Sequence, residues 1–329
     1  MAPVRFSVIA LLMASAAMFA APARADSTAT APLPGNLTTP AAPLGQMLAQ
    51  NPDTPAPTSA TPVYESDLSG FIDRWLARSD QAKADQPHWM TPLVTVTPRL
   101  EQEVRYDQYF QHLGTGANID QYDAGKGLEL IPNETNEILL NPPPYMDRSV
   151  KKPVQGWNDW QFLVVKQRLL SANEQNGNYI VTAFLGVQAP SGNTAFTNNA
   201  WVVTPTLAAG KGWGDFDIQS TVSVAVPMSY GSTIGTAVTW NTTFQYQLTK
   251  TLWPEFETNI THWYGGERGD KTQVFLTPGV IVGRFPLAGR VVGSVGVGYQ
   301  FAVSPKLQTE PALTPTYQHA WIMTARAAF

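Results

Sequence analysis

Apolar and polar residues alternate with a period of two over most of the chain, in segments of ten or more residues. Across 238–249 the even positions are Val, Trp, Thr, Phe, Tyr and Leu, and the odd positions are Thr, Asn, Thr, Gln, Gln and Thr. The segments 178–189, 214–226 and 288–302 follow the same pattern. Successive side chains of a strand point to opposite faces, so the pattern predicts long strands with one apolar and one polar face.

The length of these strands indicates their surroundings. Strands of soluble proteins centre on about 5–6 residues, whereas a strand that crosses a bilayer at a tilt needs about 9–11. We therefore predict an all-β fold, a transmembrane antiparallel β-barrel of about 12 strands, with 10–14 as the range because the second and third segments alternate poorly. The predicted strands are 93–110, 118–131, 134–142, 158–170, 178–189, 199–209, 214–226, 236–249, 253–263, 271–283, 288–302 and 319–329.

The connections between these strands are sorted by length. The long ones are every second connection: 111–117, 143–157, 190–198, 227–235, 264–270 and 303–318. The intervening ones, 132–133, 210–213, 250–252 and 284–287, are short, and 171–177 is intermediate. Long loops at one end and short turns at the other are typical of barrels of the bacterial outer membrane, and a soluble sandwich has no reason to sort its loops in this way.

The residues before the first predicted strand divide into three parts. Residues 1–25 have a basic start, an apolar run at 8–21 and a small-residue cleavage site, which together predict a signal peptide. Residues 26–62 hold eight prolines and only two charges, which predicts a disordered linker. Residues 63–92 are predicted to form one short amphipathic helix and a connector, because apolar residues recur at helical spacing between 68 and 76. This helix could pack on the rim of the barrel or plug its lumen.

The carboxyl terminus fits a closing strand. Its last residues alternate and end on Phe329, which resembles the terminal strand that the barrel-assembly machinery of Gram-negative bacteria reads during insertion. Aromatic residues gather near predicted strand ends, where barrels carry aromatic girdles in contact with outer-membrane lipid. They are Trp157, Trp160, Trp201, Trp213, Trp253, Trp263 and Tyr264.

Composition excludes several functions. The chain has no cysteine, so thiolate metal sites and cysteine nucleophiles are excluded. The mature chain carries a net charge of about −6, which disfavours nucleic acid as a partner. The four histidines stand in no serine-hydrolase motif and at no metal-ligand spacing. We therefore expect no enzyme, no cofactor, no metal and no catalytic residue, and we rank an outer-membrane hydrolase as the weakest alternative.

A family resemblance covers about residues 90–329. The stretch 97–103 (TPRLEQE), followed by Arg105-Tyr106-Asp107 and by 125–130 (GKGLEL), is similar to the transporter barrels grouped as the MetA-pathway phenol-degradation-like family. The resemblance implies an outer-membrane barrel that carries small, often aromatic or hydrophobic compounds.

Charges along the first predicted strand suggest what lines the lumen. Its odd positions hold five charged residues, which lipid would reject at a cost of about 2–4 kcal/mol for a basic residue at the midplane. Two basic residues of the fourth predicted strand are expected to join them. These lumen candidates are Arg99, Glu101, Glu103, Arg105, Asp107, Lys166 and Arg168. They could form a salt-bridge network that holds the barrel's shape, or a polar constriction that screens solutes.

Three prolines stand in predicted strands on the lipid-facing register. Because proline has no N–H to give the ladder, we expect Pro98, Pro205 and Pro278 each to lie at a bulge or kink. Such a bulge could merely curve the wall or could mark a lateral gap for apolar solutes. The sequence thus predicts a channel or transporter for passive passage of small, hydrophobic or aromatic solutes, with a plugged structural or loop-displaying barrel as the alternative.

Overall fold

The computed structural model describes residues 68–123, 126–149, 153–304 and 316–329. The predicted signal peptide, the predicted linker 26–62 and residues 63–67 lie outside the described residues. Within the described residues no helix is long and apolar enough to span a membrane.

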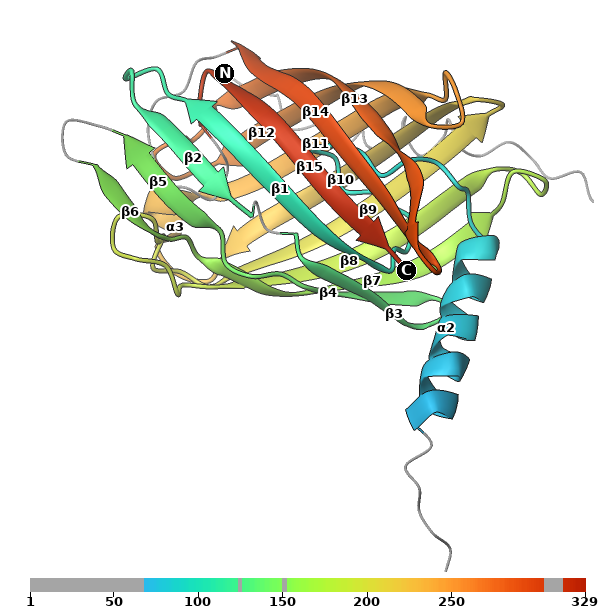
Figure 1. The fold of residues 1–329 in the computed structure, drawn as a ribbon. Helices are drawn as coiled ribbons and strands as arrows, with labels where there is room; N and C mark the ends of the chain where they lie inside the picture. Colours follow the sequence, from blue (N-terminus) through green and yellow to red (C-terminus); the bar gives the residue numbers. More distant parts are fainter. Residues whose placement is uncertain (1–67, 124–125, 150–152, 305–315) are drawn as a thin grey trace, which may run out of the picture. The chain divides into compact units, whose positions relative to one another are not determined.

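The described residues form one closed antiparallel β-barrel of 12 strands (Figure 1). The first and last strands, β1 and β15, pair from Glu103↔Ala328 to His112↔His319 and thereby close the wall. The strand segments are β1 (Glu103–His112), β2 (Asn118–Tyr122), β3 (Leu128–Asn133), β4 (Asn136–Leu140), β5 (Tyr145–Ser149), β6 (Val154–Trp157), β7 (Trp160–Ala172), β8 (Tyr179–Ala189), β9 (Val202–Trp213), β10 (Phe216–Pro227), β11 (Thr236–Tyr246), β12 (Leu252–Tyr264), β13 (Thr272–Ala288), β14 (Val291–Ser304) and β15 (His319–Ala328). A one-turn helix, α3 (Gly231–Ile234), lies between β10 and β11.

Three neighbouring strands of this wall are interrupted part of the way along. The halves of these strands are β2 and β3, β4 and β5, and β6 and β7. On one side of the interruptions β2 pairs with β5 and β5 with β6, and on the other side β3 pairs with β4 and β4 with β7. The middle interruption holds Pro142, Pro143 and Pro144, which cannot donate to a ladder. The prediction of a long loop over 143–157 is therefore wrong, because the third strand continues beyond the prolines as β5 and the fourth begins at β6.

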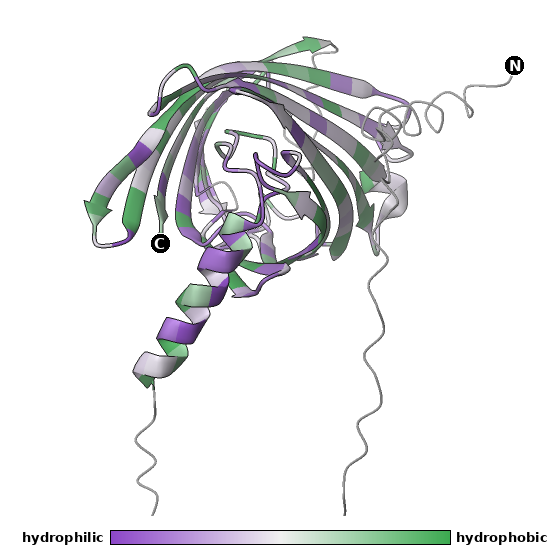
Figure 2. Ribbon diagram, turned by 90° about the vertical axis from the view of Figure 1, so that its right-hand side faces the viewer, coloured by the Kyte–Doolittle hydropathy of each residue, from purple (hydrophilic) through white to green (hydrophobic). Residues whose placement is uncertain are grey.

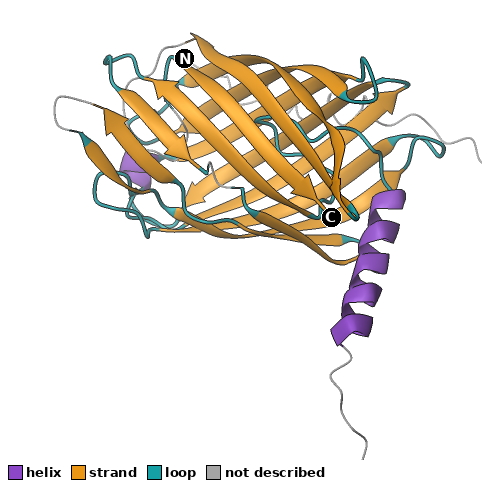
Figure 3. Cartoon of the chain, viewed as in Figure 1, coloured by secondary structure: helices purple, strands orange, loops and turns teal. Residues whose placement is uncertain are grey.

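The remaining connections are sorted by length as predicted. Short turns, such as 134–135, 214–215 and 289–290, lie at one end of the barrel, which we call the short-turn end. The longer connections, such as 190–201, 228–235 and 265–271, lie at the opposite end, the long-loop end. Figure 3 shows these loops at the two ends of the tilted strands. β1 begins and β15 ends at the short-turn end.

The outward face of the wall is apolar and the inward face is polar. On β1, Val104 and Tyr106 are exposed, whereas Glu103, Arg105 and Asp107 are buried in the lumen. Five of the predicted girdle aromatics are exposed at strand ends: Trp157, Trp160, Trp201, Trp213 and Tyr264. For Trp253 and Trp263 the prediction of a lipid-facing position is wrong. Both stand on the inward register of β12, each beneath an arginine, Arg284 and Arg268.

The first strand begins at Glu103 and not at residue 93. Residues 85–102, which we call the plug segment, form an irregular chain that folds back inside the ring of strands (Figure 2). Nearly every residue from 86 to 102 is buried. Residues 93–97 alternate as in a strand, but they lie between Pro92 and Pro98, and neither proline has an N–H to donate to a ladder. Val96, Pro98 and Leu100 therefore lie in the lumen and not on the lipid-facing wall.

The predicted helix is α2, Leu68–Ala84. It stands at the short-turn end, where Trp75 donates its Nε1–H to the carbonyl of Ile131 at 2.6 Å and Ala82 packs against Leu100 and Ile131. The apolar residues of its first turns, Leu68 among them, remain exposed. Of the two positions considered for this helix, the rim is the one that it occupies, and the chain that follows it enters the lumen.

Candidate functional site

Two carboxylates on β12 hold the tip of the plug segment. Glu257 accepts hydrogen bonds from the backbone N–H groups of Val94 at 2.8 Å and Thr95 at 2.6 Å, and also from the Thr95 hydroxyl. Glu255 accepts the N–H of Leu93 at 3.0 Å. An irregular chain inside a barrel has no ladder partner, so its buried N–H groups need side-chain acceptors, and these glutamates supply them.

Cationic side chains hold the carbonyl groups of the plug segment. Arg105 donates to the carbonyl of Leu93 at 2.7 Å, and Arg326 donates to that of Pro92 at 2.6 Å. Lys166 donates to the carbonyl of Arg99 at 3.3 Å. Polar residues on β8 and β10 complete the set: Thr182 donates to Pro98, and Gln219 donates to Met90. The wall thus holds the carbonyl groups of the plug segment through side chains from five strands.

The lumen candidates split between the plug segment and the wall. Arg99 and Glu101, expected on a strand, lie in the plug segment, where Arg99 Nη1 is 3.2 Å from Glu101 Oε1. Glu103, Arg105, Asp107, Lys166 and Arg168 stand on strands of the wall and are buried. Two of these basic residues form short ion pairs: Arg105 with Asp107, at 2.8 and 2.9 Å, and Lys166 with Glu137, at 2.8 Å.

Arg168 bonds the end of α2 and a turn of the wall. Its Nη1 donates to the carbonyl of Ala82 at 2.6 Å, and its Nη2 donates to the carbonyl of Glu134 at 2.6 Å. Ala82 belongs to the last turn of α2, whose carbonyl groups have no partner within the helix. Arg168 therefore ties the end of α2 to the turn between β3 and β4.

The ladder does not bulge at the prolines singled out from the sequence. Pro205 and Pro278 are exposed on the outward face of β9 and β13. The β9–β10 and β13–β14 ladders skip two pairs beside them and resume in the same register. Each missing N–H thus costs a local pairing without inserting a residue, and the expected bulge is absent at both. Pro98 lies buried in the plug segment.

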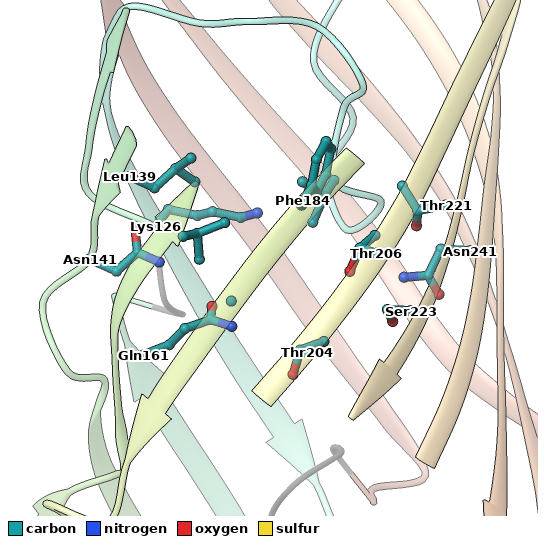
Figure 4. A pocket seen from close by; sticks show the side chains of 13 residues that line it. Lys126, Leu139, Asn141, Gln161, Phe184, Thr204, Thr206, Thr221, Ser223 and Asn241 are labelled. Carbon is teal, nitrogen blue, oxygen red and sulfur yellow. The ribbon is translucent and has the colours of Figure 1, made fainter. Parts of the chain in front are cut away.

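A cavity of about 200 Å³ lies between the plug segment and the wall (Figure 4). Val96 of the plug segment borders it, and the other lining residues come from the wall between residue 126 and β11. Its wall residues lie farther from the short-turn end than those that hold the plug segment: Thr221 and Ser223 line the cavity, whereas Gln219 bonds the plug segment. The cavity is therefore on the long-loop side of the plug segment. The lining residues are Val96, Lys126, Leu139, Asn141, Gln161, Val164, Phe184, Gly186, Thr204, Thr206, Thr221, Ser223 and Asn241.

Beside the cavity, an aromatic cluster fills another part of the lumen. Tyr317, from the connection between β14 and β15, is buried against Phe275, with ring centroids 4.9 Å apart. Its hydroxyl bonds the side chain of Gln300, and Val94 of the plug segment packs against the same cluster. Space for a solute above the plug segment is thus concentrated on the side of β7 to β11.

Sequence reasoning missed the residues that hold the plug segment and line the cavity. Three of these residues could have been identified from the sequence, because each is a charged residue on the inward face of a clearly alternating strand. They are Glu255, Glu257 and Arg326. Gln219 and the threonines of the cavity carried no such signal, because a polar residue on that register is expected anywhere in a lumen. Their grouping exists only once the barrel closes.

At the short-turn end a glutamate fixes the start of the plug segment. Glu174, in the turn between β7 and β8, accepts the backbone N–H of His88 at 2.5 Å and lies 2.9 Å from its ring Nδ1. Burial acts to raise the pKa of the Glu174 carboxyl, but the bonds from His88 outweigh it and the pKa is lowered. The neighbouring Lys83 donates to the carbonyl of Phe329 at 2.8 Å, and burial lowers its pKa.

Each described histidine contacts a polar or aromatic side chain. His112 stacks on His319, with centroids 4.8 Å apart, and its Nδ1 is 2.7 Å from Asn118 Oδ1. His262 lies 2.8 Å from the hydroxyl of Thr272. Among the described residues no group of three or more His, Cys, Asp or Glu side chains is placed to hold a metal ion.

No family model matches the chain, and no curated protein matches it. Among solved structures, the NanC porin is 7% identical, with a TM-score of 0.44 over 69% of this chain and 98% of that one. An outer membrane channel from Pseudomonas putida F1 is 12% identical, with a TM-score of 0.45 over 68% and 92%. OmpF of Salmonella typhi is 10% identical, with a TM-score of 0.34 over 69% and 96%.

Proposed function

We propose that this protein is a channel of the bacterial outer membrane that lets small solutes pass by diffusion, with the plug segment as its constriction. The observation that carries the proposal is the barrel itself. Its outward face is apolar between exposed aromatic residues, and its inward face is polar and surrounds a cavity. A closed strand wall has no free edge, so its backbone groups pair within the sheet, which is the condition for a strand protein to lie in a bilayer.

The orientation follows from the loops. Barrels of this kind place short turns in the periplasm and longer loops outside the cell. The plug segment therefore closes the periplasmic half of the lumen, and the cavity opens toward the outside. A solute from outside would reach the cavity first and would pass only when the plug segment yields.

The hydrogen bonds that hold the plug segment allow such movement. They join side chains of the wall to an irregular chain, so they can be exchanged for water without breaking a strand pair. We assign the charged residues Arg105, Lys166 and Glu257 this holding role and propose that they also set the polarity of the constriction.

A sealed barrel is the second candidate function. It is favoured by the same plug segment, which is buried almost throughout and held by side chains from β12 as well as from the five strands that bond its carbonyl groups. Such a barrel would anchor a complex or display its long loops, and no solute would cross it. The resemblance of 97–103 and 125–130 to phenol-degradation-like transporters supports the channel, with small apolar or aromatic solutes as cargo. Phe329 and β15 are proposed to be read by the barrel-assembly machinery.

Location and conductance test the proposal separately. We expect the protein in the outer-membrane fraction, resistant to carbonate washing, and migrating differently in detergent gels before and after boiling. In planar bilayers we expect small single-channel steps from the wild-type chain and larger ones after replacement of 89–98 by a glycine-serine linker of equal length. A folded barrel in which neither form conducts would favour the sealed barrel, and a carbonate-soluble protein would refute the membrane assignment.

A further inference from the structure

The cavity above the plug segment carries one charged group on its wall. Among the described residues that line it, Lys126 is the only acidic or basic one, and Figure 4 shows its amine directed into the space between the strands. Among the described residues no hydrogen bond or ion pair joins the Lys126 amine to a partner. The carboxylates that interact with Lys126, Glu129 and Asp107, form their ion pairs with Lys166 and Arg105 instead. An amine in this position attracts an anion.

A second observation comes from the amides of the cavity. Asn141 is 2% exposed, and within the described part of the chain neither its Nδ2 nor its Oδ1 has a hydrogen-bond partner. Asn241 Oδ1 is also buried without a partner there. Leaving a buried polar atom unsatisfied costs about 1–3 kcal/mol, and native proteins contain few such atoms. Three such atoms, from two amides on the wall of one cavity, indicate that a polar molecule bonds them.

The remaining lining residues indicate that the other end of that molecule is apolar. Val96, Leu139, Val164 and Phe184 supply an apolar side, and Phe184 is buried. A dry cavity of about 150 Å³ is known to hold benzene. The volume of about 200 Å³ here thus fits one ring with a small polar substituent.

We propose that this cavity is a binding site for a small monocarboxylate that carries one ring-sized apolar group. The carboxylate pairs with the amine of Lys126 and accepts a hydrogen bond from Asn141 Nδ2, and the apolar group lies against Phe184. The positive charge of Lys126, with no acidic residue beside it in the described lining, disfavours cations. The inference deepens the proposed function and rests on it, because the solute must reach the cavity through the long-loop end.

Equilibrium binding tests the site without requiring conduction. The full mature chain, refolded in detergent, is titrated by calorimetry with benzoate, with its neutral counterpart benzamide and with acetate. We expect saturable benzoate binding, with benzamide and acetate each bound at least about ten-fold more weakly, the effect of one charge-assisted hydrogen bond or one buried ring. Lys126→Met should weaken benzoate about ten-fold and leave benzamide within about two-fold. Lys250→Met removes the same charge from an exposed turn and should change neither.

Three results would overturn the site: unchanged benzoate affinity in Lys126→Met, the same loss in Lys250→Met, or equal affinities for benzoate and benzamide. Gel migration before and after boiling verifies that each variant folds. Should Lys126→Met fail to fold, Lys126→Arg must keep benzoate binding within a few-fold and Asn141→Leu must weaken it. Conductance separates the two proposals. A barrel that binds benzoate but never conducts keeps the site and refutes the channel, whereas conduction without binding that depends on Lys126 refutes the site alone.

Discussion

Replacing Glu257 with leucine should release the plug segment. In the wild-type barrel this carboxylate accepts the N–H groups of Val94 and Thr95, and all three groups are enclosed by the lumen. Leucine leaves two buried backbone N–H groups without acceptors, at about 1–3 kcal/mol each, whereas the Thr95 hydroxyl, which also donates to Glu257, can rotate. Leucine also removes the desolvation cost of the carboxylate when the plug segment docks. We therefore take about 1 kcal/mol for each N–H group, a net loss of about 2 kcal/mol in the docking free energy. The undocked population should then rise about thirty-fold.

The absence of cysteine from the chain allows a direct measurement. Leu93 is wholly buried, so a Leu93→Cys variant reacts with a water-soluble maleimide only while the plug segment is undocked. In the limit of fast docking, the labelling rate is proportional to the undocked population. We expect the rate to rise about thirty-fold when Glu257→Leu is added. Glu267→Leu, which removes a charge from an exposed residue at the long-loop end, is the matched control and should leave the rate unchanged.

The reasoning fails if Glu257→Leu labels no faster than its parent while migrating as a folded barrel. That result would mean that water inside the lumen already satisfies the tip of the plug segment. An equal acceleration by Glu267→Leu would refute the specific role of Glu257, because net charge alone would then explain the effect.

Four further expectations can be checked with the same refolded protein. Arg105→Met should cost about 3–5 kcal/mol in urea-unfolding experiments, and adding Asp107→Ala should recover part of that loss, because an unpaired buried charge is worse than none; additive losses would argue for solvated, independent groups. Since the pKa of Glu174 is lowered, its contribution is complete above its ordinary value of 4.5 and disappears as pH falls through the folded-state pKa; Glu174→Gln should therefore flatten the acid side of the labelling-rate profile, by under about 1 kcal/mol for so exposed a pair. Deleting Phe329 should lower the yield of inserted barrel more than deleting 26–60, measured as the heat-modifiable fraction. Pro205→Val adds a ladder donor in unchanged register and should raise stability by about 0.5–1.5 kcal/mol with conductance unaltered, whereas a drop in stability would indicate that the wall needs the kink.

The strands from β8 onward were predictable because their cause is local. The prediction of 178–189 differs from β8 by one residue, and 319–329 differs from β15 only by Phe329. In these segments each residue contacts either a lipid-like exterior or a polar interior, so alternation records the fold directly. Hairpin connections then set the order of the strands, and the closure of β1 on β15 follows from the number of strands.

The plug segment was not predictable from alternation. Val94 and Val96 alternate with Thr95 and Thr97 because the lumen also has two kinds of surroundings. Thr95 and Thr97 bond polar side chains on β12 and β10, whereas Val94 packs against the aromatic cluster and Val96 borders the cavity. Period two therefore indicates two environments and does not by itself identify a strand. The cavity could not be predicted either, because Lys126 and Ser223 become neighbours of one space only through the closed wall.

The plug segment enters and leaves the barrel through the same mouth. Its first residues are fixed at the short-turn end, where Ser171 bonds the carbonyl of Asp85, and its last residue precedes Glu103, which pairs with Ala328 at that end. A loop whose two ends lie at the same opening can leave the lumen as a loop. No chain terminus has to pass through the pore, and no strand pair of the wall has to break. The strands can therefore close into a barrel before the plug segment enters the lumen. The plug segment can also leave the lumen later while the wall stays closed.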